Sequence, residues 1–273
     1  MKCIICSNDA DATGSHIVPA SLIQNCVGKH YREESYSIDA KNVNIDLYFG
    51  RDNLKNTSTE IKKNHYKEDH ILCQACEKNL ADIESEFSIN FLQKFREERF
   101  KANFIITNDQ NGTETLTPKN LTKEKIYFYL YSIIFRYCMN CGRKRGQYFM
   151  EESDLENIRI FLNEYMYGDQ AVGIEHLKEF NMVITFDKAD SNGSFISSAN
   201  QFKNPYIFYF CQPILLLFRG NLDTNAAKIF GEINGKRYEE NLEEFNAEMN
   251  KIDINDSERA MKTYHMLLQK YRS

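Results

Sequence analysis

Four cysteines near the amino terminus are spaced as two Cys-x-x-Cys pairs. Cys3 and Cys6 form the first pair, and Cys73 and Cys76 form the second. Four thiolates match the tetrahedral coordination of Zn²⁺, and the positive end of a helix entered at Cys76 favours ionised sulfur. The spacing therefore predicts a structural zinc site. Buried free cysteines and a redox-active pair are the alternative interpretations of the same residues.

His16 lies between the two pairs, in the segment Ser-His-Ile-Val-Pro. An imidazole pKa near neutrality suits a general base, although a lone histidine is more often structural. The combination of a first Cys-x-x-Cys, a His-Ile-x-Pro step and a closing Leu-Cys-x-x-Cys resembles the HNH endonuclease family and its ββα-metal fold. The resemblance covers roughly residues 1–100. The residues that carry it are Cys3, Cys6, His16, Pro19, Leu72, Cys73 and Cys76.

The resemblance implies a treble-clef zinc domain and hydrolysis of DNA phosphodiester bonds. It assigns His16 as the general base that deprotonates the attacking water. A second divalent ion, Mg²⁺ or Mn²⁺, would polarise the scissile phosphate. The zinc bound by the four cysteines would be structural. Because similar proteins occur in anti-phage defence or mobile-element loci, the resemblance also suggests an effector of bacterial defence.

Three positions depart from the family pattern. Ser15 stands where Asp or Glu commonly binds the metal, and Glu77 follows the second pair where His or Asn is frequent. Glu68 stands where Asn is often found, and Asp69 is next to it. Since hard divalent cations accept carboxylates readily, His16, Glu77 and Asp69 are the predicted ligands of the catalytic ion, with Glu77 also predicted to be catalytic. Alternatively, these carboxylates are ordinary surface charges.

A third pair, Cys138 and Cys141, runs into the basic segment Arg143-Lys144-Arg145. The three basic side chains are predicted to contact nucleic-acid phosphates. A helix C-terminus with Gly142 as its cap and basic residues beside it is the alternative explanation. The side chains that could complete a second metal site with this pair are His176 and Cys211.

Hydrophobic patterning predicts an α+β fold with an HNH-like zinc domain at 1–105 and a mainly helical domain with a few strands at 106–273. The turn-rich segment 108–117 is the predicted boundary. The predicted helices cover 19–26, 76–100, 126–137, 152–165 and 257–271. The helix at 76–100 has Leu80, Ile83, Phe87, Phe91 and Phe95 on its buried face. The helix over 126–137 is apolar nearly all round and starts at Pro118 or Thr122. The predicted strands are 43–49, 182–186 and two within 206–218 that are separated near Pro213.

The composition limits the classes of function. Of the 273 residues 42% are hydrophobic, which predicts a folded protein, and the longest apolar run, 206–218, is too short to cross a bilayer. No signal peptide is recognisable, so we expect a cytoplasmic protein without a membrane partner. The net charge of −5 disfavours promiscuous DNA binding and favours a protein partner that recruits or restrains the chain. The oligomeric state is not predicted. The competing function is a catalytically inactive zinc-binding interaction or adaptor module.

Overall fold

The computed structural model describes residues 1–27, 35–40, 43–48, 66–108, 114–178, 180–185, 195–199, 206–210 and 214–219. The predicted helix at 257–271 and the histidines His30 and His65 lie outside these residues. The helices are α1 (Ala20–Val27), α2 (Gln74–Phe87), the π-helical η2 (Ser88–Leu92), the 3₁₀ helix η3 (Glu98–Asn103), α3 (Lys123–Arg145), α4 (Glu152–Tyr167) and α5 (Gln170–Glu175). The strands are β1 (Ser15–His16), β2 (Ser35–Ala40), β3 (Val43–Tyr48), β4 (Lys67–Glu68), β5 (Phe104–Asn108), β6 (Glu114–Pro118), β7 (Phe180–Thr185), β8 (Phe195–Ala199), β9 (Tyr206–Phe210) and β10 (Ile214–Arg219).

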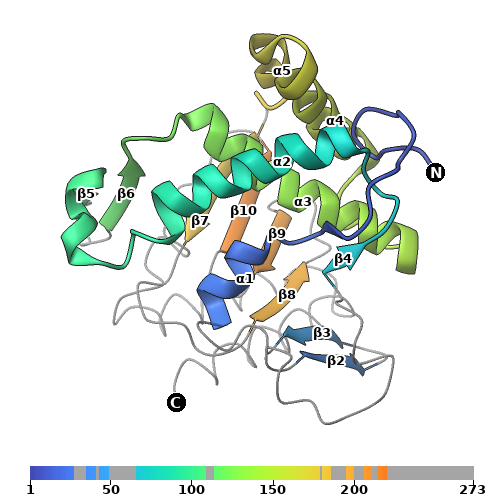
Figure 1. The fold of residues 1–273 in the computed structure, drawn as a ribbon, viewed down its shortest axis with the longest axis horizontal. Coiled ribbons are helices and arrows are strands. Elements are labelled where there is room, and N and C mark those ends of the chain that lie inside the picture. The colour runs from blue at the N-terminus through green and yellow to red at the C-terminus, as the bar shows by residue number, and fades with distance from the viewer. Residues whose placement is uncertain are drawn as a thin grey trace.

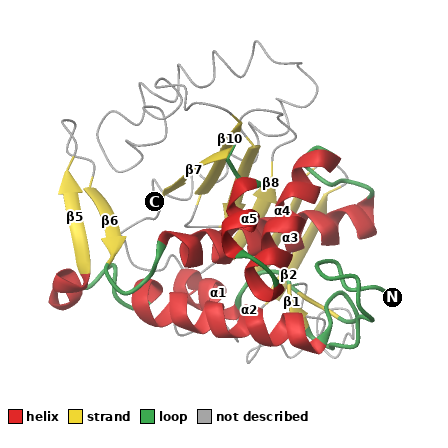
Figure 2. Ribbon diagram, turned by 90° about the horizontal axis from the view of Figure 1, so that it is seen from above, coloured by secondary structure: helices red, strands yellow, loops and turns green. Residues whose placement is uncertain are grey.

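The largest sheet has six strands in the order β2-β3-β8-β9-β10-β7, and each neighbouring pair is antiparallel. The predicted strands at 43–49, 182–186 and within 206–218 all belong to it. Strands β2 and β3 come from the segment between the two cysteine pairs, and the pairing of β3 with β8 joins them to the carboxyl-terminal strands. Figure 2 shows the helices gathered on one side of this sheet. The fold is therefore a mixture of helix and strand.

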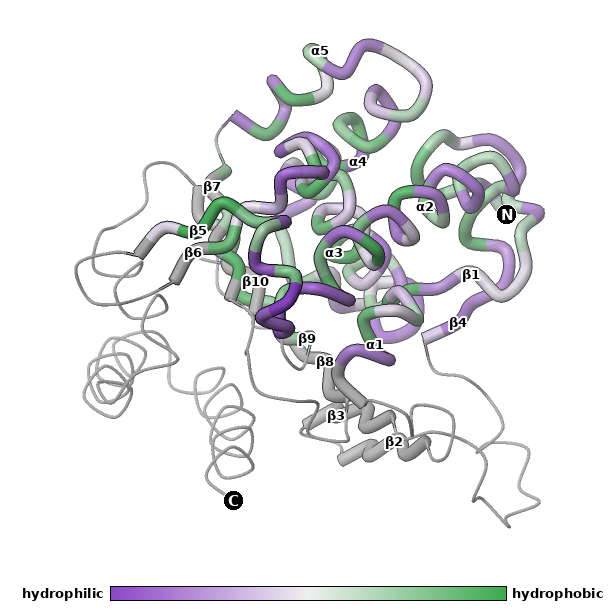
Figure 3. The backbone as a smooth tube through the Cα atoms, turned by 60° about the vertical axis from the view of Figure 1, so that its left-hand side comes forward, coloured by the Kyte–Doolittle hydropathy of each residue, from purple (hydrophilic) through white to green (hydrophobic). Residues whose placement is uncertain are grey.

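Helix α3 runs through the middle of the helical layer, with α1, α2 and α4 around it (Figure 3). Every residue from Phe128 to Cys138 is buried, which confirms the prediction of a central helix that is apolar nearly all round. The Oγ1 of Thr122 accepts a hydrogen bond from the backbone N–H of Lys125, as expected of an N-cap. On its sheet side, the ring of Tyr137 lies edge-on to Phe210 with centroids 5.4 Å apart.

The last turn of α3 differs from the sequence interpretation. Its C-cap is Gly146, with a left-handed φ of 70°, and Gly142 lies inside the helix. A Cβ at Gly142 would lie 2.2 Å from the ring of Tyr148, so any larger residue there would displace that ring. The basic segment 143–145 consequently forms the last helical turn, where positive charge complements the helix dipole.

The predicted helix 76–100 is correct in its buried face and too long in its extent. Phe87, Phe91 and Phe95 are buried and consecutive rings lie 5.2 and 5.0 Å apart. The α-helix ends at Phe87, widens into η2, and η3 follows as a separate turn. A wider helical turn still places side chains four residues apart on one side, so the apolar spacing does not report the change.

The segment predicted to be a turn-rich boundary is instead flanked by paired strands. β5 and β6 form a two-stranded hairpin, which projects from the body of the protein beside η3 (Figure 1). The division at 105/106 remains a prediction, but buried side chains from both parts belong to one hydrophobic core. Within the described residues, no helix is long and apolar enough to cross a membrane.

Candidate metal centre and the surroundings of His16

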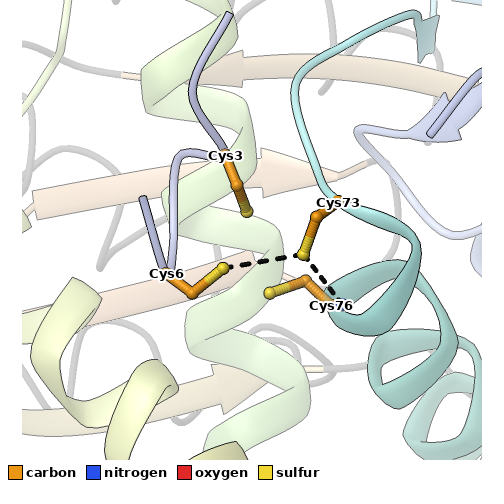
Figure 4. Close-up of side chains that lie close together, drawn as sticks. All are labelled: Cys3, Cys6, Cys73 and Cys76. Atoms are coloured by element: carbon orange, nitrogen blue, oxygen red, sulfur yellow. Dashed lines mark hydrogen bonds between the residues drawn. The ribbon is translucent and has the colours of Figure 1, made fainter. Parts of the chain in front are cut away.

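The four cysteines of the first two pairs converge on one point. Their sulfur atoms all lie within 4.8 Å of one another, and the Sγ atoms of Cys6 and Cys73 are 3.6 Å apart. Figure 4 shows all four side chains directed inward, two from the amino-terminal loop and two from the start of α2. Four sulfurs at about 2.3 Å from a tetrahedral Zn²⁺ would be about 3.8 Å apart. The cluster is therefore close enough to hold one metal ion.

Local backbone geometry explains how the first pair is presented. The N–H of Cys3 donates to the carbonyl of Asn8, and the N–H of Ser7 donates to the carbonyl of Cys3. Ser7 has a positive φ of 62°, which lets the chain reverse directly after the second ligand. This tight turn brings both sulfurs to the same side of the chain.

The second pair is presented by the first turn of α2. Cys73 is the N-cap of this helix, and its sulfur accepts from the backbone N–H of Cys76 at 3.5 Å. A cysteine at the N-cap and another three residues later lie on one side of the first helical turn. The N–H groups at this helix end also favour thiolate sulfur.

The pKa values of two thiols in the cluster are shifted in opposite directions. A hydrogen bond from the Cys76 thiol lowers the pKa of Cys3 to about 4, whereas the same contact and burial raise the pKa of Cys76 far above its usual value. One sulfur can thus ionise only because a neighbour keeps its proton. A bound cation would let all four ionise together, which fits the donor set to a thiolate-binding metal.

Helix α4 contributes two further contacts to this centre. The hydroxyl of Tyr167 donates to the Sγ of Cys76 at 3.3 Å. The Nη1 of Arg159 donates to the carbonyl of Ile5, which lies between the first two ligands, at 2.8 Å. Both donors are distant in sequence from the cysteines, and sequence reasoning did not identify them. They connect the carboxyl-terminal part of the chain to the metal centre.

We expect Tyr167→Phe to weaken zinc binding about tenfold, because outer hydrogen bonds to metal ligands commonly account for 10- to 100-fold in affinity. Competition with a chelating dye measures the change. Tyr148→Phe is the matched control, since Tyr148 is 42% exposed and Tyr167 is 49% exposed. Equal zinc affinities for the two variants would contradict a role of the Tyr167 hydroxyl.

His16 is half-buried on β1, between the two halves of the cysteine cluster in sequence. β1 pairs with β4, with Ser15 opposite Glu68 and His16 opposite Lys67. Burial, with the nearby positive charges of Lys67 and Arg136, lowers the pKa of His16 to about 4. The imidazole is therefore neutral at physiological pH and is a weaker base than an ordinary histidine. Within the part of the chain that the structure describes, no hydrogen bond to its ring is present.

Of the residues considered for a catalytic ion, Glu68 lies on β4, Asp69 directly follows it, and Glu77 lies on α2. Asp69 is exposed, and its Oδ1 accepts from the backbone N–H of Gly14 at 2.7 Å. Glu68 forms an ion pair with Lys144. Among the described residues, the four cysteines are the one group of three or more Cys, His, Asp or Glu side chains that converge on a common point. His16, Glu77 and Asp69 are not such a group.

Of the described residues at which the sequence departs from the HNH pattern, two have a buried oxygen with neither a hydrogen-bond partner nor an ion pair. They are the Oγ of Ser15, which is fully buried, and the Oε2 of Glu77 on the first turns of α2. The third such residue, Glu68, is paired through its Oε2 with Lys144. A buried polar atom without a partner is costly unless a ligand or ion satisfies it. The two oxygens are consistent with a polar ligand near β1 and α2.

The third cysteine pair is separate from this centre. Cys138 and Cys141 are both buried within α3, and they join no ligand cluster among the residues described. The Nδ1 of His176 lies 3.4 Å from the Oδ1 of Asn157, and Cys211 lies outside the described residues. Nothing in the described structure assembles the second metal site that was considered for this pair.

Part of the basic segment that follows this pair lies next to the paired strands β1 and β4. Lys144 forms the ion pair with Glu68 on β4, and the guanidinium of Arg143 is 3.5 Å from the carbonyl of Lys2. A small pocket is lined by side chains that include Ile17, Lys144 and Arg145. Cationic side chains thus reach β4 and the residue after β1 from the last turn of α3.

The most informative residue missed in the sequence is Arg136, which is 1% exposed and contacts the backbone of His16. A single arginine within a long apolar helical segment was the available signal, because buried charges are nearly always paired. Comparison of the chain with protein-family models, with curated proteins and with solved structures found no match.

Proposed function

We propose that the protein is a metal-dependent DNA endonuclease of the HNH type, with one structural Zn²⁺ bound by Cys3, Cys6, Cys73 and Cys76. The carrying observation is the arrangement of the cysteine cluster around β1 and β4. The first pair lies on a tight turn, the antiparallel strands β1 and β4 lie between the two pairs in sequence, and the second pair lies on the first turn of α2. This order of turn, paired strands and helix supports a treble-clef zinc domain in which α1, β2 and β3 are inserted between β1 and β4.

In this proposal His16 is the general base. Its ring is neutral at physiological pH and can therefore accept a proton from water, but its lowered pKa makes it a weaker base than an ordinary histidine. A divalent ion, Mg²⁺ or Mn²⁺, would supply Lewis-acid stabilisation of the scissile phosphate. The residues offered for that ion are Glu77, through its unpartnered Oε2, and Ser15, through its unpartnered Oγ. Asp69 is less suited, because it already accepts a backbone hydrogen bond.

The substrate in this proposal is DNA, held in part by the last turn of α3. Lys144 and Arg145 lie beside the paired strands β1 and β4, and Arg143 contacts the main chain of Lys2, so we expect phosphates that pass His16 to meet the first two. Neutralisation of phosphates by such side chains supplies much of the affinity of nucleic-acid binding. The overall charge of −5 restricts this contact to a local patch. It favours activity that depends on a recruiting or restraining protein, as in a defence effector.

A catalytically inactive zinc-binding adaptor is the second candidate function. The observation in its favour is that His16, Glu77 and Asp69 do not converge as a group of ion ligands. An adaptor needs the structural zinc alone and leaves the imidazole of His16 without a chemical role. The two functions therefore differ in the number of divalent ions that the folded chain binds.

The deciding experiment combines metal counting with cleavage. Purified protein is analysed for zinc, titrated with Mn²⁺ by calorimetry, and incubated with supercoiled plasmid in Mg²⁺, Mn²⁺ or EDTA. The nuclease proposal expects one tightly bound zinc, a weaker Mn²⁺ site, and nicking that EDTA abolishes. One zinc with neither Mn²⁺ binding nor nicking would reject the nuclease and leave the adaptor.

A further inference from the structure

Arg136 is a fully buried cation at the meeting point of three elements. It lies on α3 and is 1% exposed. Its Nη1 donates to the main-chain carbonyl of His16 on β1, and its Nη2 lies 2.7 Å from the Oε1 of Glu84 on α2. Its Nε donates to the carbonyl of Ser132, one turn earlier in α3, at 3.1 Å. The guanidinium is thus held in one orientation by partners on all three elements.

These contacts connect the strand of His16 to the helix that begins at the second cysteine pair. Glu84 lies on α2, the helix whose first turn carries Cys76. A planar guanidinium with several donors can fix two partners at once, which a flexible ammonium group does less well. The bond to the carbonyl of His16 restricts the peptide that carries the imidazole, so ring position depends on α3 and α2.

Stability alone is a weak explanation for such a pair. Removing two charges from water costs several kcal/mol, and well-packed apolar side chains in their place are often neutral or more stabilising. The position of Arg136 also prevents any direct contact with a substrate, because almost none of its surface is accessible. Its three contacts are better explained by a need for a defined geometry at β1.

We propose that Arg136 is a positioning residue that fixes His16 for proton abstraction, through the hydrogen bond to the His16 carbonyl and the ion pair with Glu84. This inference rests on the proposed nuclease function and adds to it a dependence on the carboxyl-terminal part of the chain. Displacement of a reacting group by about 1 Å can reduce a rate about 100-fold. The loss is therefore expected in kcat, while DNA binding and KM change little.

The test uses the full chain and the double variant Arg136→Met/Glu84→Gln, which removes both charges together and leaves neither one buried alone. Plasmid cleavage gives kcat and KM, and zinc content and thermal unfolding report the fold. We expect kcat to fall about 10- to 100-fold, with KM and zinc content within about twofold of wild type. The matched control is Arg96→Met, which removes another arginine bridge, to Asn25 on α1, and is expected to retain wild-type kcat.

A second variant, Arg136→Lys, keeps the charge but can make fewer of the three contacts, so an intermediate kcat is expected. It also serves if the double variant does not fold. A folded, zinc-loaded variant of either kind with wild-type kcat would overturn the positioning role while leaving the nuclease intact. Absence of cleavage by the wild-type chain would instead refute the nuclease, and the positioning role with it.

Discussion

Cys76→Ala is expected to abolish zinc binding and to unfold the amino-terminal part of the chain. The apparent free energy of zinc binding to structural four-ligand sites is about 10–16 kcal/mol, comparable to or larger than the total stability of a typical domain, about 5–15 kcal/mol. The sulfur of Cys76 is fully buried and lies within 4.8 Å of the other three. Three remaining thiolates would bind the ion weakly, and their repulsion would oppose the folded arrangement.

Zinc analysis of the purified variant and thermal unfolding measure this effect. The matched control is Cys138→Ala, because Cys138 is also 0% exposed but lies in α3, apart from the cluster. Its loss is expected to cost on the order of 1 kcal/mol, as for other small deletions in a core, with zinc content unchanged. If both variants lost the same stability and the wild type held no metal, the cluster would be four buried free thiols.

His16→Ala is expected to reduce DNA cleavage by about 10²–10⁴-fold, the usual contribution of a general base. Replacement removes the proton acceptor but leaves the hydrogen bond from Arg136, because that bond is made to the main-chain carbonyl. The fold, the zinc content and the affinity for DNA should therefore be close to those of the wild type. Cleavage rates with saturating plasmid, together with DNA binding in Ca²⁺, separate the chemical step from binding.

The matched control for this change is His176→Ala. His176 is also half-buried, but it lies in the segment that follows α4, and its Nδ1 is beside Asn157. Its replacement is expected to leave the cleavage rate within about twofold, because surface substitutions away from a site usually have small effects. Equal rates for His16→Ala and the wild type would remove His16 from the mechanism. A different residue would then have to act as the general base of a reaction that depends on the divalent ion.

Several features of the centre were predictable because they depend on neighbours that are close in sequence. A Cys-x-x-Cys pair brings its own two sulfurs together, whether on a tight turn or on the first turn of a helix. The apolar run of α3 likewise predicts a buried helix, since its periodicity is a property of consecutive residues. The Thr122 cap and the boundaries of α4 follow from the same kind of local signal.

Other features depend on contacts that no local pattern contains. The Tyr167 hydroxyl meets the Cys76 sulfur across 91 positions, and Arg136 reaches the His16 carbonyl across 120. The change from α2 to η2 is hidden because both kinds of turn keep the phenylalanines on one side. Gly142 was interpreted as a helix cap, whereas it lies inside the helix, where any larger residue would displace the ring of Tyr148.

The amino-acid sequence by itself therefore determined which side chains can bind a metal, which segment forms the central helix, and where a candidate base lies between the two cysteine pairs. Tertiary structure decided that the four sulfurs share one centre, that Arg159 and Tyr167 contact it, and that Arg136 reaches the main chain of His16. It also decided that the side chains offered for a catalytic ion do not form one cluster among the described residues. The physical reason is that periodicity and capping act over one or two helical turns, whereas convergence depends on how distant elements pack.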